Sequence, residues 1–197
     1  MTTPHISQTA LPQHYALARM TSPLGRIELT ADDDHLLSVR IGYADQLPLD
    51  AFGEHPSPLL DAAVLQLTEY FAGTRTTFDL PLSLDHGTEF QQRVWSALKA
   101  IPFGTATSYG AVAQAVGQPG AGRSVGGAIA ANPLPLFIGC HRVLSVSGEI
   151  TGYSQGAGVV TKAWLLTHER IPFVVAPPRI ETDPVGAILD LIEVDVV

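Results

Sequence analysis

The hydrophobic pattern of the chain changes near residue 86, and this change divides it into two units of different construction. Before this point apolar and polar residues alternate over 25–30 and again over 36–41, with an aspartate triplet between, which predicts a β-hairpin. Apolar residues then recur every three or four positions over 59–71, as in an amphipathic helix, and 78–82 has the pattern of a further strand. The first 85 residues therefore predict a small α+β domain.

The second unit, residues 86–175, is mainly helical in pattern. Thr88 with a glutamine three residues later has the form of a capping box, which predicts the start of a helix. Two short helices are predicted over 109–116, with Ser108 as its cap, and over 121–131, and a glycine-containing turn separates them. This arrangement is typical of a helix-turn-helix. Residues 176–197 form an acidic and apolar tail that we treat as a separate segment.

One cysteine, Cys140, is the only thiol of the chain, so an intrachain disulfide is excluded. It follows the apolar run 134–138 after one glycine, and this run predicts a buried strand. A helix is predicted further along the chain, over 160–170. A thiol is a nucleophile when it is deprotonated, and His141 and Arg142 are neighbours that lower a thiol pKa. Free cysteines are also among the most buried residues, so a purely structural role is the alternative.

Composition limits the class of protein further. With 46% apolar residues among 197, the chain can bury a proper core. It contains no run approaching the roughly 18 to 20 apolar residues of a membrane span, and it begins without the features of a secretion signal. A cytoplasmic protein is therefore expected, in a compartment that keeps its thiol reduced. The formal charge of −8 argues against coating nucleic acid by bulk electrostatics, so any contact with nucleic acid has to be local.

Seven motifs between residues 87 and 169 occur in an order that resembles the O6-alkylguanine-DNA alkyltransferase family. They are Gly87-Thr88-x-Phe90-Gln91, Ile101-Pro102-x-Gly104-x-x-x-Ser108-Tyr109, Arg123-Ser124-Val125-Gly126-Gly127-Ala128, Asn132-Pro133, Cys140-His141-Arg142-Val143, Gly152-Tyr153-Ser154 and Lys162-x-Trp164-Leu165-Leu166-x-x-Glu169. The first unit is also similar to the smaller domain of this family, through Ser22-Pro23-Leu24-Gly25 and Tyr70-Phe71-x-Gly73.

The resemblance implies an α/β protein with a small ribonuclease-H-like N-terminal domain and a helical C-terminal domain that carries a helix-turn-helix. It also implies direct repair of double-stranded DNA, in which the alkyl group on O6 of guanine moves irreversibly to one cysteine of the protein. O4-alkylated thymine is a further substrate that the resemblance suggests. Neither a metal nor another cofactor is expected, and the protein is expected to act as a monomer.

Four residues receive catalytic roles from the resemblance. Cys140 is the alkyl acceptor, His141 takes its proton through a bound water, and Glu169 orients the imidazole, as in other Cys-His-acid arrangements. Asn132 belongs to a tight turn that positions the segment carrying the thiol. Each of these residues has an ordinary structural role when considered alone, and the ordered motifs are what favours catalysis.

A further group of residues is expected to bind the substrate, because a base inside a duplex reaches a buried thiol only when it is rotated out of the stack. Tyr109 donates a hydrogen bond to a ring nitrogen of the departing guanine, and Arg123 fills the place that the base has left. The small residues of the second short helix allow close approach to the minor groove. The remaining contacts are assigned to Gly122, Ser124, Val143, Tyr153 and Ser154.

Two alternatives to alkyl transfer remain from the sequence. The family usually has proline before the cysteine, whereas this chain has Gly139, which is expected to leave the segment less restricted. If this change disables the chemistry, the protein binds alkylated bases and marks them for other repair factors. A regulator that reads DNA sequence through its helix-turn-helix is the second alternative, although the second short helix carries little charge.

Overall fold

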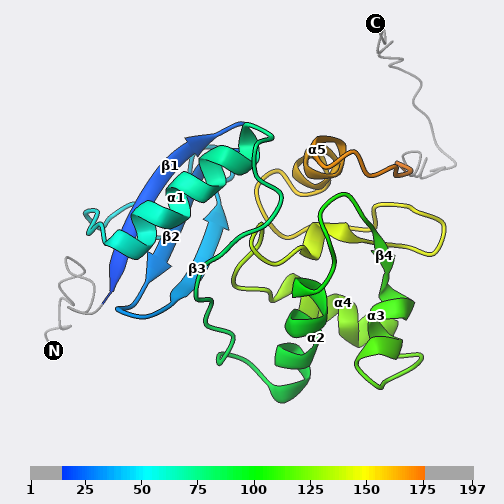
Figure 1. The fold of residues 1–197 in the computed structure, drawn as a ribbon. Coiled ribbons are helices and arrows are strands. Elements are labelled where there is room, and N and C mark those ends of the chain that lie inside the picture. Colours follow the sequence, from blue (N-terminus) through cyan, green and yellow to red (C-terminus); the bar gives the residue numbers. More distant parts are fainter. Residues whose placement is uncertain (1–14, 176–197) are drawn as a thin grey trace, which may run out of the picture.

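The computed structural model of the protein describes residues 15–175, and the tail predicted over 176–197 lies outside them. Within this range an N-terminal sheet with one helix is followed by a mainly helical part (Figure 1). The elements are β1 (Ala16–Ser22), β2 (Gly25–Ala31), β3 (Leu36–Ile41), α1 (Pro58–Phe71), α2 (Glu89–Lys99), β4 (Thr107–Ser108), α3 (Tyr109–Ala115), α4 (Gly122–Ala130), the 3-10 helix η1 (Cys140–Arg142), β5 (Val143–Leu144) and α5 (Val159–His168).

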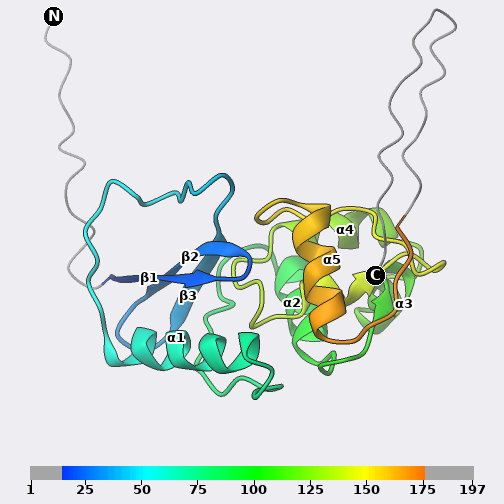
Figure 2. The same cartoon turned by 90° about the horizontal axis from the view of Figure 1, so that it is seen from above.

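The predicted hairpin is confirmed as β2 and β3, and β1 extends it into an antiparallel sheet of three strands in the order β1-β2-β3. The helix predicted over 59–71 is confirmed as α1, which begins after Ser57, whose side chain accepts a hydrogen bond from the amide of Leu60. Its buried side chains face the sheet, and Figure 2 shows α1 lying along one side of the strands. Helix and sheet thereby bury each other's apolar faces.

The strand predicted over 78–82 is wrong. The segment is extended, but it makes one isolated bridge, between Leu36 and Leu82. Pro81 lies inside it and has no amide hydrogen, so its carbonyl accepts from Leu36 but a ladder cannot continue through it. The alternating apolar residues are there because the segment packs against the core, which gives the same pattern as a strand.

The strand predicted over 134–138 is also wrong, because the run forms a tight buried turn. Leu136 has a φ of 76°, and the amide of Ile138 donates back to the carbonyl of Leu134 over 2.9 Å. The Oδ1 atom of Asn132 accepts from the amide of Leu134, and its Nδ2 atom donates to the carbonyl of Ile138. A turn that is apolar because it is buried cannot be distinguished from a strand by its apolar residues alone.

The helical part confirms the predicted helix starts. The side chains of Thr88 and Gln91 form the reciprocal capping box at the start of α2, and Ser108 caps α3 through the amide of Ala111. Helices α3 and α4 follow each other across a glycine turn and pack together, so the helix-turn-helix is confirmed (Figure 1). Helix α5 confirms the last predicted helix and ends at His168.

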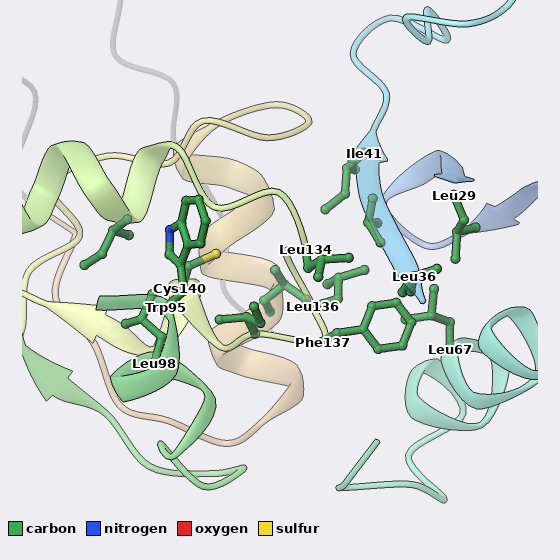
Figure 3. Close-up of a cluster of buried hydrophobic side chains, with 14 of the residues drawn as sticks. Leu29, Leu36, Ile41, Leu67, Trp95, Leu98, Leu134, Leu136, Phe137 and Cys140 are labelled. Carbon is green, nitrogen blue, oxygen red and sulfur yellow. The ribbon is translucent and has the colours of Figure 1, made fainter. Parts of the chain in front are cut away.

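The buried turn joins the two parts of the core. Figure 3 shows the side chains of Leu134, Leu136 and Phe137 between Cys140 and Trp95 on one side and Leu36 of the sheet on the other. The buried apolar residues of the sheet, of α1 and of the helical part form one continuous cluster. The position of the thiol relative to the N-terminal domain is therefore set by packing across this turn.

Arg170, directly after α5, has a φ of 57°, which is costly for any residue with a Cβ atom. Its amide donates to Thr167 and that of Ile171 donates to Leu166, which closes the helix end. We expect Arg170→Gly to raise the free energy of unfolding by about 1 kcal/mol in chemical denaturation, because glycine adopts this conformation freely. Arg93→Gly, at an exposed position inside α2, is the control and should lower it by a similar amount. A less stable Arg170→Gly variant contradicts this interpretation.

Candidate functional site

Cys140 is the first residue of η1, just after the buried turn, and it is only 4% exposed. It nevertheless lines a cavity of about 540 Å³ between the helix-turn-helix and the loop before α5. The lining residues are Tyr109, Gly122, Arg123, Gly126, Ile129, Ala130, Cys140, Thr151, Gly152, Tyr153, Ser154 and Lys162. The thiol is thus buried in the protein but faces a space large enough for a flipped base.

The predicted cause of thiol activation is wrong in one respect. Burial raises the pKa of Cys140, and neither His141 nor Arg142 is among the main groups that lower it, since the side chains of both are bound to Glu169. Asn132, Tyr153 and the charge of Lys162 act in the opposite direction but do not outweigh burial in the thiol pKa. The thiol is therefore neutral at rest, and a base has to remove its proton during the reaction.

His141, the next residue in the chain, is the candidate for that base. Its ring is fully buried, and its Nε2 atom lies 2.8 Å from Oε1 of Glu169. An ionised carboxylate only accepts hydrogen bonds, so Nε2 carries the proton and Nδ1 has a free lone pair. Burial lowers the pKa of His141, and the charges of Arg142 and Lys162 lower it further, so that Glu169, which raises it, does not outweigh them. Among the described residues Nδ1 has no hydrogen-bond partner, so it is available to accept a proton.

Glu169 follows α5 and is buried, unlike a typical acid at a helix end. Its Oε2 atom accepts from Nε of Arg142 at 2.8 Å and from the amide of Gly104 at 3.2 Å. Its Oε1 atom accepts from His141, from the second nitrogen of the Arg142 fork at 2.9 Å and from the hydroxyl of Tyr70 at 2.9 Å. Burial raises the pKa of Glu169, but these donors outweigh it and the net pKa is lowered, so the carboxylate stays ionised.

Sequence reasoning missed the parts that Arg142, Tyr70 and Lys162 play in this cluster. Lys162 is 1% exposed, and its Nζ atom donates to the carbonyl of Val143 over 2.6 Å, beside the thiol. Burial lowers the pKa of Lys162 to about 8, while the charge of an ionised Cys140 raises it. A lysine among the buried positions of an apolar helix was the available signal, since such a lysine needs a specific partner.

Several of the predicted substrate residues line the cavity, on opposite walls. Tyr109 and Gly122 come from the helix-turn-helix, and Tyr153 and Ser154 come from the loop before α5. The hydroxyl of Tyr109 accepts from Thr151 at 3.0 Å, which leaves its own proton free for donation. The hydroxyl of Ser154 donates to the carbonyl of Ala130 and so ties the loop to the end of α4.

Arg123 lines the cavity, is exposed, and makes no ion pair with any residue in 15–175. Other predicted positions lie outside the cavity lining. Ser124 is exposed on α4, and Val143 is buried with its carbonyl bound to Lys162. Of the small residues of the second short helix, which were expected to face the minor groove, Ala128 is buried, and its backbone carbonyl accepts from the indole of Trp95.

Gly139 has a φ of −69°, which is the value that proline would impose. The folded backbone therefore matches the one expected with the usual proline. The difference lies in the side chains, since a Cβ atom on Gly139 would come within 2.7 Å of Cδ of Arg142. The guanidinium of Arg142, which holds Glu169, thus packs directly over this glycine.

Comparisons with known proteins agree with this geometry. Residues 14–84 match the family model described as 6-O-methylguanine DNA methyltransferase, ribonuclease-like domain, and residues 89–171 match that of the DNA binding domain of the same enzyme. The constitutive methylated-DNA--protein-cysteine methyltransferase of Bacillus subtilis is 43% identical over 156 residues, which cover 77% of this chain and 93% of the relative.

Solved structures give the same result. A crystal structure of Mycobacterium tuberculosis O6-methylguanine methyltransferase is similar with a TM-score of 0.70 and 40% identity, covering 79% of this chain and 93% of the other. A crystal structure of Mycobacterium tuberculosis OGT in complex with DNA is similar with a TM-score of 0.68 and 42% identity, covering 81% and 95%. The chain therefore belongs to the 6-O-methylguanine DNA methyltransferase family.

Proposed function

We propose that this protein repairs DNA by moving the alkyl group from O6 of guanine to the sulfur of Cys140, once per molecule. The observation that carries the proposal is a single thiol that faces a base-sized cavity and lies next in sequence to a buried histidine with a free Nδ1 lone pair. Relatives that are 43% identical to it over 156 and 150 aligned residues are named as methylated-DNA--protein-cysteine methyltransferases. The partner is double-stranded DNA that carries the alkylated base.

The reaction requires that a sulfur–carbon bond forms while the bond from the alkyl carbon to O6 breaks. His141 takes the thiol proton at Nδ1 through a water, and the carboxylate of Glu169 stabilises the imidazolium that results. The charge of Lys162 favours the thiolate as it forms. The electron pair of the broken bond passes to the guanine, and Tyr109 stabilises the departing base by a hydrogen bond from its hydroxyl to a ring nitrogen. The proton that His141 took from the thiol returns through water to the base and completes the neutral guanine.

The product is an intact guanine in DNA and a thioether on Cys140. An alkyl thioether is stable in water and does not exchange with thiols, and Cys140 is the only cysteine of the chain, so each molecule acts once. We further propose that the protein acts as a monomer in the cytoplasm, where a free thiol stays reduced. The structure has, within residues 15–175, no helix of the length and apolarity that crossing a membrane requires.

Free O6-benzylguanine tests transfer separately from DNA binding. We expect the wild-type protein to gain one benzyl group on Cys140, seen in the mass of the peptide that contains it. A protein that binds alkylated bases without chemistry leaves the peptide unchanged, and that result would contradict the proposal. Exhaustion of activity after one equivalent of the base is the expected stoichiometry.

Arg123 is proposed to stabilise the duplex from which the base has rotated. We expect Arg123→Ala to slow single-turnover transfer from a duplex carrying O6-methylguanine by about tenfold, because unstacking a base costs a few kcal/mol. Transfer from free O6-benzylguanine needs no unstacking and should change less than about twofold. Arg93→Ala, which removes an exposed arginine of α2, is the matched control for lost positive charge. Equal losses with both substrates would contradict this role.

A further inference from the structure

Tyr70, in the last turn of α1, contacts both Glu169, the proposed catalytic acid, and the residue that precedes it. Its hydroxyl donates to Oε1 of Glu169 over 2.9 Å, and its backbone carbonyl lies 2.8 Å from Nε2 of His168. His168 and Glu169 are consecutive residues at the end of α5. One residue of α1 therefore holds both the acid and the helix end from which the acid extends.

The ring of Tyr70 is fixed in place by packing. The residue is 1% exposed, and its ring makes edge contacts with Phe71, Phe103 and His168 at centroid distances between 4.9 and 6.1 Å. His168 in turn stacks on Trp164 at 5.0 Å. His168 is half-buried between these aromatic rings. A phenol with so little freedom holds its hydroxyl at a fixed position.

The hydroxyl of Tyr70 acts on the same carboxylate oxygen that orients His141. Oε1 of Glu169 accepts from both, and the fork of Arg142 also reaches it. Burial, together with the charge of Glu169, raises the pKa of Tyr70, so the phenol remains a donor throughout the physiological range. Without this donor the carboxylate of Glu169 would be freer to rotate. Its negative charge would also be less neutralised by hydrogen bonding and would stabilise a protonated His141 more strongly.

We propose that Tyr70 is a positioning residue for alkyl transfer, through which the N-terminal domain holds Glu169 in the orientation that keeps His141 a base. The proposal rests on the proposed function of Cys140. It gives the N-terminal domain a defined part in the reaction, although none of its residues lines the cavity in the described part of the chain.

The first test is Tyr70→Phe, which keeps the ring and removes only the hydroxyl. We expect single-turnover transfer from O6-benzylguanine to slow by about tenfold, as expected for the loss of a hydrogen bond to a charged group. The final yield should remain one alkyl group per molecule, since Cys140 is untouched. Tyr43→Phe, at a residue that is 69% exposed, is the matched control and should react at the wild-type rate.

The pH profile separates positioning from a general structural effect. In Tyr70→Phe the carboxylate has one donor fewer, so more of its charge acts on His141 and the pKa of the imidazole rises. The acidic limb of the rate profile should therefore move to higher pH, while that of Tyr43→Phe stays in place. Five titratable or charged groups surround the imidazole of His141 or the ring of Tyr70, and both variants leave them unchanged. They are Cys140, Arg142, Lys162, His168 and Glu169.

A double-mutant cycle with Glu169→Gln completes the test. If Tyr70 acts through Glu169, adding Tyr70→Phe to Glu169→Gln should slow the remaining transfer by less than about twofold. A full tenfold loss in that background, or a Tyr70→Phe variant with the wild-type rate and pH profile, overturns the role of Tyr70 and leaves the proposed function intact. A wild-type protein that accepts no alkyl group overturns the proposed function itself, and the role of Tyr70 with it.

Discussion

Cys140→Ala is expected to abolish alkyl transfer, with a loss of at least about 10⁴-fold in the single-turnover rate, because the chain contains no second thiol. The measurement follows disappearance of O6-methylguanine from a labelled duplex under excess protein. Binding of the same duplex should change by less than about threefold, since the cavity walls and Arg123 remain. The variant therefore separates lesion recognition from chemistry.

Cys140→Ser provides the control for this variant. A hydroxyl of similar size fills the site but is a far weaker nucleophile than a thiolate, so transfer should again be lost. Melting temperatures of both variants close to that of the wild-type protein would exclude unfolding as the cause. Residual transfer by either variant at more than a small fraction of the wild-type rate would mean that another group accepts the alkyl.

Glu169→Gln is expected to slow transfer by about 10³- to 10⁴-fold and to lower the free energy of unfolding by about 3 to 5 kcal/mol. The amide can donate to Nε2 of His141, which favours the tautomer with its proton on Nδ1 and so removes the base. The same change leaves the buried guanidinium of Arg142 without an opposite charge. Rapid-quench kinetics and urea denaturation measure the two effects separately.

Two comparisons sharpen this prediction. Glu89→Gln changes a carboxylate that is 87% exposed and paired with Arg93 on α2, so its effect on stability should stay within about 0.5 kcal/mol.

The pKa of Glu169 is lowered on folding, so its contribution to stability is complete above the unfolded value near 4.5 and is lost as the pH falls through the folded pKa. Glu169→Gln should lack this acidic part of the stability profile, and a profile identical to that of the wild-type protein would contradict the buried ion pair.

The sequence predicted the elements that have local signals. The cap at Thr88 with Gln91, the cap at Ser108 and the spacing of apolar residues in α1 depend on neighbouring residues, and each is found in the structure. The runs 78–82 and 134–138 were predicted as strands and are not. Their apolar residues record burial, while Pro81 and the left-handed Leu136 decide the backbone, and burial alone does not distinguish a strand from a packed turn.

The candidate site shows the same division. The motifs pointed to Cys140, His141 and Glu169. In the structure His141 follows Cys140 directly in the chain, and its Nε2 atom is hydrogen-bonded to Oε1 of Glu169. The sequence could not indicate that Arg142 binds Glu169 instead of approaching the sulfur, because that depends on the direction of a side chain in η1. Nor could it pair Tyr70 with Glu169, 99 residues apart, since this contact exists only after the two domains pack together.

Mass spectrometry of the peptide containing Cys140, after incubation with one equivalent of a duplex carrying a single O6-methylguanine, tests the proposed repair reaction most directly. We expect this peptide to gain one methyl group in place of the thiol hydrogen, in the same amount as the guanine restored in the DNA. Loss of the lesion from the duplex with Cys140 unmodified would contradict the proposed transfer.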